Sequence, residues 1–126
     1  MLAGWYNVSL LMQKILLYYK FTPVKDPDAL MLWQKALCSG LNLRGRIIVS
    51  PHGINGTVGG EMDDLKKYIK ETKAFVGFKG IVFKWSDGSR EDFPRLSVKV
   101  RPELVGFQAA DETVVDENGV VNGGEK

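Results

Sequence analysis

The chain has 126 residues, enough for one domain with a buried core. Hydrophobic residues make up 44% and charged residues 25%, and the longest apolar stretch near the start, residues 15–19, is too short to cross a bilayer. The single cysteine, Cys38, excludes an internal disulfide and is typical of a reducing compartment. These features predict a cytoplasmic protein with no membrane partner.

The net charge of +2 hides an uneven distribution along the chain. Residues 1–101 carry a balance of +7, whereas residues 102–126 carry a balance of −5. A basic body followed by an acidic tail predicts an anionic partner for the body. A solvated surface of mixed charge would account for the same numbers without any such partner.

Strand patterns alternate with two helix patterns along the chain. The first helix has Asp26 as a suitable N-cap, Pro27 at the first helical position and Ser39-Gly40 at its end. The second helix has acidic residues in its first turn and lysines later, which suits the helix dipole. In chain order the predicted elements are strand 14–21, helix 27–40, strand 46–50, strand 54–58, helix 61–72, strand 80–85 and strand 95–101.

This order is β-α-β-β-α-β with one extra strand, the α+β ferredoxin-like plan in its acylphosphatase-like variant. The plan predicts an antiparallel sheet with two helices on one face, while the other face stays open. We expect an irregular segment at residues 1–13, the ferredoxin-like domain at 14–105, and an acidic flexible tail at 106–126.

The open face of the sheet is the first candidate for function. Strand 95–101 alternates strictly, so Lys99 and Arg101 are predicted to point away from the helices. Similar logic places Tyr18 and Lys20 on that outer face, with Lys84 as a further candidate. On such a face the cations could bind phosphates and the aromatic ring could stack on bases, which would suit nucleic acid. The alternative is that these side chains form an ordinary solvated surface.

The segment from Arg44 to Gly56 is the second candidate, because its three glycines and one proline demand special backbone geometry at a tight hairpin. Its polar side chains, including His52, suit either an anion or RNA contact or simply a well-made turn. His52 is the only histidine and Cys38 the only cysteine, so the usual four ligands of a zinc site are not available from these residue types. No metal or cofactor is predicted, since the sequence also has no nucleotide-binding glycine motif.

Four short motifs in a fixed order carry a resemblance to a known family. They are Tyr18-Tyr19-Lys20-Phe21, Gly45-Arg46 before an apolar strand, Gly53-Ile54-Asn55, and Lys99-Val100-Arg101 ahead of Glu103. Together they resemble the N-terminal domain of the bacterial rhodanese-like tRNA uridine hydroxylases. The resemblance implies an enzyme that uses molecular oxygen to form 5-hydroxyuridine at the wobble position of tRNA. It also implies a C-terminal rhodanese-like domain that carries the reactive cysteine.

The resemblance therefore gives this domain the expected partners tRNA and the rhodanese-like domain of the same protein. The domain is expected to contribute tRNA contacts and not chemistry, so no catalytic residue is assigned to it. Residue chemistry, and not the resemblance, selects the RNA-binding candidates, which are Tyr18, Lys20, Arg46, His52, Asn55, Lys99 and Arg101.

Two other interpretations stay open at the level of sequence. In the first, the domain is a scaffold that packs on the rhodanese-like domain and touches no RNA. In the second, it is a hydrolase of the acylphosphatase type. The second is disfavoured because residues 22–25, after the first strand, contain no arginine, and Asn55 alone cannot replace an arginine–asparagine pair.

Overall fold

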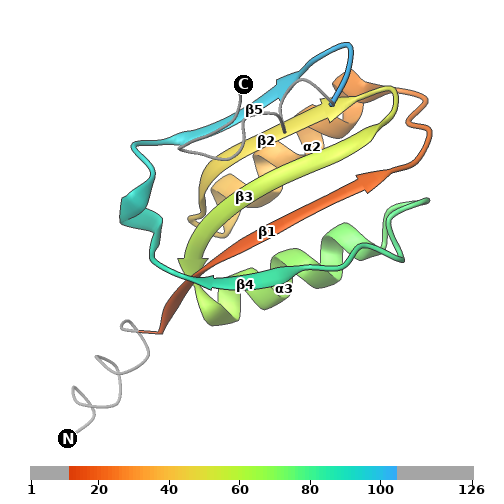
Figure 1. Cartoon of the computed structure of the whole chain (residues 1–126). Coiled ribbons are helices and arrows are strands. Elements are labelled where there is room, and N and C mark those ends of the chain that lie inside the picture. Colours follow the sequence, from red (N-terminus) through yellow and green to blue (C-terminus); the bar gives the residue numbers. More distant parts are fainter. Residues whose placement is uncertain (1–11, 105–126) are drawn as a thin grey trace, which may run out of the picture.

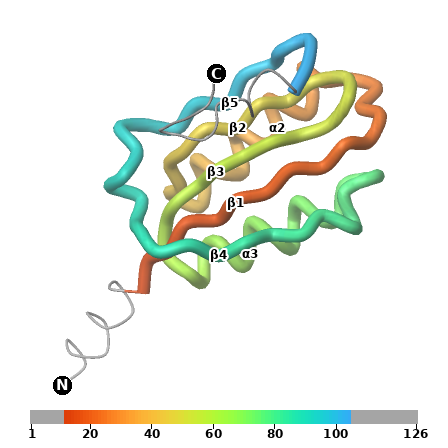
Figure 2. The backbone as a smooth tube through the Cα atoms, viewed as in Figure 1, coloured from red at the N-terminus to blue at the C-terminus, as the bar shows by residue number. Residues whose placement is uncertain are grey.

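Five strands form one sheet, and two α-helices cover one of its faces (Figure 1). The computed structural model describes residues 12–104, so the predictions for residues 1–11 and 105–126 lie outside it. The tube trace follows the same path from β1 to β5 (Figure 2). The elements are β1 (Gln13–Phe21), α2 (Pro27–Gly40), β2 (Arg44–Ser50), β3 (Gly53–Glu61), α3 (Met62–Lys73), β4 (Lys84–Asp87), the 3-10 helix η1 (Arg90–Asp92) and β5 (Leu96–Val100).

The strand order is β4-β1-β3-β2-β5, which confirms the predicted βαββαβ plan with an extra strand. β1 pairs antiparallel with β3 and β4, and β2 pairs antiparallel with β3, but β2 and β5 run parallel. The sheet is therefore mixed, and the prediction of a wholly antiparallel sheet was wrong for this one pairing. The reason is that the chain crosses from one edge of the sheet to the other after β4. The connection from β4 to β5, which contains η1, passes once along one end of the sheet. β5 therefore runs in the same direction as β2.

α2 begins and ends where its sequence signals predict. The Asp26 side chain accepts a hydrogen bond from the backbone N–H of Ala29 at 3.1 Å, and Pro27 occupies the first turn. The buried positions of this helix are Leu30, Gln34 and Cys38, at helical spacing of four. A glutamine thus lies at the centre of the buried face of this helix, between a leucine and a cysteine.

The core lies between the sheet and the helices and is continuous. Its strand residues come from alternate positions, as a sheet covered on one face requires. The largest contributors to the core are Leu16, Tyr18, Leu30, Ile47, Val49, Ile54, Val58, Leu65, Tyr68 and Phe78.

No helix within residues 12–104 is long and apolar enough to span a bilayer.

The strand predicted at residues 80–85 is shorter and lies later in the chain than expected. The backbone N–H of Ile81 donates to the Phe78 carbonyl at 3.1 Å, so this segment begins in a turn and not in the sheet. β4 starts at Lys84, pairs only with residues 14–17 of β1, and is exposed at every position. Because β4 is so short, no strand among residues 12–104 pairs with this edge of β1 beyond Leu17.

Candidate nucleic-acid interface

Tyr18 lies on the helix face of the sheet, so its predicted place on the open face was wrong. Its side chain is 4% exposed, and Leu16 beside it on the same face is fully buried. The alternation grouped Tyr18 and Lys20 correctly but assigned both to the wrong face. Residues 15–19 are apolar or aromatic at every position, so a period of two cannot show which half is buried.

Tyr18 belongs to a buried chain of polar side chains that joins β1 to both helices. Its hydroxyl forms a short hydrogen bond with that of Tyr68, which donates to Oε1 of Gln34 at 2.6 Å. Gln34 in turn donates from Nε2 to Thr72 Oγ1 at 3.2 Å. Burial is the largest cause that raises the pKa of both tyrosines above the ordinary range, so both stay neutral at physiological pH. This chain is structural, and Tyr18 cannot stack on a ligand.

The open face carries a row of side chains that runs across four strands. Tyr19 lies opposite Asn55, Asn55 lies opposite Ile48, and Ile48 lies opposite Lys99. Residues paired in this way point to the same side of a sheet, so the row joins an aromatic ring on β1 to a cation on β5. The neighbouring row consists of Leu17, Thr57, Arg46 and Ser97.

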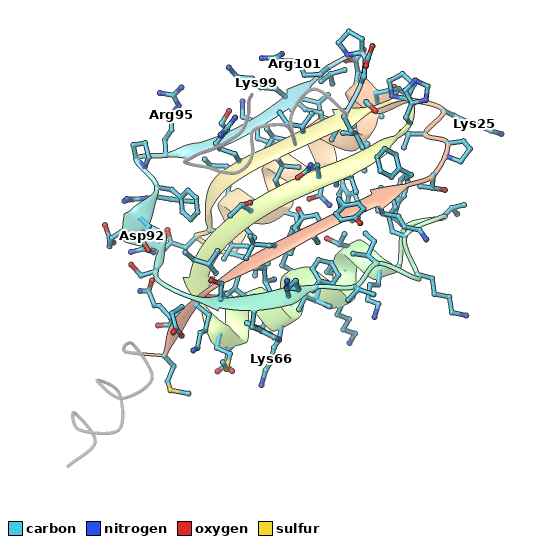
Figure 3. The ribbon with its side chains drawn as sticks, in the orientation of Figure 1. Lys25, Lys66, Asp92, Arg95, Lys99 and Arg101 are labelled. Carbon is cyan, nitrogen blue, oxygen red and sulfur yellow. The ribbon has the colours of Figure 1, made fainter. Side chains whose placement is uncertain are left out.

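A basic groove of about 570 Å³ follows β2 and β5 at one end of these rows. Its cations are Arg46, Arg95, Lys99 and Arg101, and Phe93 contributes an apolar wall. Figure 3 shows Arg95, Lys99 and Arg101 projecting from the β5 side of the sheet. Within residues 12–104, no acidic side chain forms an ion pair with Arg95, Lys99 or Arg101. Glu103 also lines this groove, so four cations and one carboxylate leave its lining with a positive formal charge.

An aromatic groove of about 780 Å³ lies at the other end, along the edge of β1 that β4 leaves uncovered. Tyr19 and Phe21 line it with 62% and 50% of their surface exposed, and their rings meet edge to face with centroids 5.9 Å apart. Lys20 and Lys84 line the same groove. Lys20 is thus not part of the open face but lies at its margin, with its ammonium beside Gly80.

The two polar residues of the hairpin segment separate in the structure. His52 is exposed in the turn, where its backbone N–H donates to Ser50 Oγ at 2.9 Å and its carbonyl accepts from Thr22 at 2.9 Å. Asn55 instead lies inside β3, half-buried, and shares the open face with Tyr19. The interpretation as a turn therefore fits His52, while Asn55 belongs to the open face of the sheet.

Cys38 lies fully buried on the inner face of α2 and lines neither groove. Burial raises the pKa of its thiol to about 12, so the thiol stays protonated and is a poor nucleophile. Among the described residues, no three His, Cys, Asp or Glu side chains lie close enough together to hold a metal ion.

Comparison with known proteins bears on both the fold and the family. The sequence model of the UPF0176 acylphosphatase-like domain matches residues 13–104. The chain belongs to this family. Proteins named tRNA uridine(34) hydroxylase from Corynebacterium glutamicum and Arthrobacter are 66% and 59% identical to it over 111 and 113 residues. These alignments cover 88% and 90% of the chain but only 36% and 38% of the relatives. The UPF0176 acylphosphatase-like domain thus spans little more than a third of the curated relatives it matches, as the predicted resemblance implies.

Solved structures confirm the fold of the UPF0176 domain at low sequence identity. BlrP1 BLUF superposes with a TM-score of 0.56 at 17% identity, over 78% of this chain and 69% of that one. An acylphosphatase from Coxiella burnetii superposes with a TM-score of 0.50 at 15% identity, over 72% of this chain and 95% of that one. The acylphosphatase-like, ferredoxin-like prediction is therefore confirmed.

Proposed function

We propose that this domain is the tRNA-binding part of a tRNA uridine(34) hydroxylase. The curated relatives carry that name and are nearly three times as long as the matched region. On this proposal, hydroxylation of the wobble uridine takes place in the part of the enzyme beyond this domain. The domain itself contributes affinity for tRNA in the cytoplasm and holds the substrate in place.

The basic groove along β2 and β5 is the observation that carries this proposal. Phosphate contacts from Lys and Arg supply most of the sequence-independent affinity for nucleic acid, and a sheet face can present several of them at once. Lys99 lies on β5 and Arg101 directly follows that strand, while Arg46 lies on the neighbouring β2. Three cations spread over β2 and the end of β5 suit a phosphate backbone better than a single small anion.

Titration of the domain with a tRNA that carries uridine 34, at several salt concentrations, tests this proposal. The informative variant is Lys99→Ala with Arg101→Ala, which removes two cations from the basic groove. The matched control is Lys66→Ala with Lys70→Ala, which removes the same charge from exposed positions of α3 on the opposite side of the sheet. Both doubles change the net charge equally, so any difference between them is local.

We expect the Lys99/Arg101 variant to bind more weakly and to show a shallower dependence on salt, with a slope smaller by about one for each lost phosphate contact. The control should bind as the unaltered domain does. Equal binding by all three proteins, or none by any of them at low salt, would favour the alternative in which the domain is a scaffold for the rest of the enzyme.

A further inference from the structure

We infer that the aromatic groove is a stacking site for an unpaired nucleobase, so that the domain grips a single-stranded loop and not a duplex. This inference rests on the proposed function, because it assigns the kind of RNA that the open face takes. Its site consists of Tyr19, Phe21, Asn55 and Lys84. None of these residues was singled out for stacking by the sequence, which favoured Tyr18 instead.

The exposure of the two rings is the first observation. Tyr19 and Phe21 point away from the helices and lie outside the hydrophobic core. Two large aromatic side chains that remain half or more exposed, side by side on a sheet, offer flat faces to a ligand. Bases stack well on such faces whatever their identity, and stacking is the usual way that proteins hold single-stranded RNA.

Polar groups around the rings match the rest of a nucleotide. Asn55 lies directly opposite Tyr19, and its amide has both donors and an acceptor for the edge of a base. Lys84 is exposed on β4 and lines the same groove, where its ammonium can meet a phosphate. The groove itself, at about 780 Å³, is within the range of pockets that take small organic ligands.

The arrangement of the two grooves excludes a duplex from using both. The row from Tyr19 to Lys99 crosses three strand intervals, so the aromatic and basic ends lie roughly 14 Å apart. In a duplex the bases are stacked inside the helix, and side chains reach mainly phosphates and ribose hydroxyls. An unpaired strand can place a base on Tyr19 and continue its phosphates across Ile48 to the basic groove.

The probes are a short single-stranded RNA with a central 2-aminopurine and an RNA duplex of equal charge. The test variant is Tyr19→Ala, and Tyr19→Phe keeps the ring without the hydroxyl. Tyr19→Leu keeps apolar bulk without a flat face, so it separates base stacking from docking of an apolar protein surface. Leu32→Ala on α2 is the matched control, because Leu32 is also 62% exposed but lies on a helix.

We expect the unaltered domain to prefer the single strand and to change the fluorescence of the 2-aminopurine on binding. Tyr19→Ala and Tyr19→Leu should each weaken single-strand binding by roughly 5-fold or more, while duplex binding and the salt slope stay the same. Tyr19→Phe and Leu32→Ala should bind as the unaltered domain does.

Unchanged single-strand affinity in Tyr19→Ala would overturn this inference. If Lys99→Ala with Arg101→Ala still weakened tRNA binding in that case, the proposed function would stand without it. If instead none of the RNAs bound the unaltered domain, the proposed function would fail as well. A Tyr19→Leu variant that binds RNA normally would point to a protein surface as the occupant of the groove.

Discussion

Gly56 on β3 is a position where a single methyl group should destabilise the domain strongly. A Cβ at residue 56 would lie 2.9 Å from Cε1 of Tyr18 and closer still to Cζ and the hydroxyl oxygen. The ring cannot retreat, because Phe83 packs against it with centroids 4.8 Å apart and Tyr68 lies on another side at 6.0 Å. Gly56→Ala must therefore displace either the ring or the strand.

The size of the effect follows from these contacts. Overpacking a core by one methyl group costs about 1–3 kcal/mol. Displacing the Tyr18 ring also breaks its hydroxyl contact with Tyr68, at a cost of about 1 kcal/mol. We expect Gly56→Ala to lower the free energy of unfolding by about 2–4 kcal/mol. That is a large share of the roughly 5–15 kcal/mol available to a domain of this size.

Urea unfolding followed by circular dichroism measures this change. Gly40→Ala is the matched control, because a Cβ there meets nothing within 4 Å and alanine is favourable in a helix. The same Gly56→Ala change in a Tyr18→Leu background should cost much less, since the ring it collides with is gone. A loss below about 1 kcal/mol for Gly56→Ala, or the same loss in both backgrounds, would refute the argument that this glycine is required by the Tyr18 ring.

Three further predictions concern the buried groups. Tyr68→Phe should lower the free energy of unfolding by about 1–3 kcal/mol, because Gln34 loses its donor, whereas Tyr19→Phe on the surface should change it by less than about 0.5 kcal/mol; urea unfolding of both distinguishes them. Cys38 should resist a thiol reagent at pH 8 in the native protein and react at once in urea, and rapid native labelling would contradict its burial. The contribution of the Cys38 thiol to the free energy of unfolding should be fully present below pH 9, the ordinary pKa of a thiol. It should fall as the pH rises towards about 12, because the folded state holds the Cys38 proton more tightly than the unfolded state does. Cys38→Ala should reduce that fall in a pH series of urea midpoints, and the buried tyrosines act in the same direction at still higher pH.

The order of the helices and strands could be predicted because turn residues and helix caps mark where these elements begin and end. Asp26 and Pro27 start α2 where expected, and the strict alternation around Lys99 correctly predicts a buried Val98 and an outward lysine. Such local signals survive folding because each depends on a few neighbouring residues. The parallel pairing of β5 depends on where the chain crosses the sheet, and no local pattern records that.

The candidate site was predicted only in part. The basic side of the face rests on the alternation of one strand, and the structure brings Arg46, Lys99 and Arg101 together in one groove. The aromatic side was assigned to Tyr18 because both halves of β1 are apolar, and only the packing of the helices decides between Tyr18 and Tyr19. Gln34 lies inside an otherwise apolar helix face, so its buried partners also required the tertiary structure.

The place where RNA contacts the domain is the most direct test of this account. Amide chemical shifts of the ¹⁵N-labelled domain, recorded during addition of an anticodon stem-loop RNA that carries uridine 34, would map it residue by residue. We predict shifts along the open face, at Tyr19, Asn55 and Lys99, and little change at Lys66 or Lys70 on α3. Shifts concentrated on α3, or no shifts at all at low salt, would contradict the claim that the open face of this sheet grips tRNA.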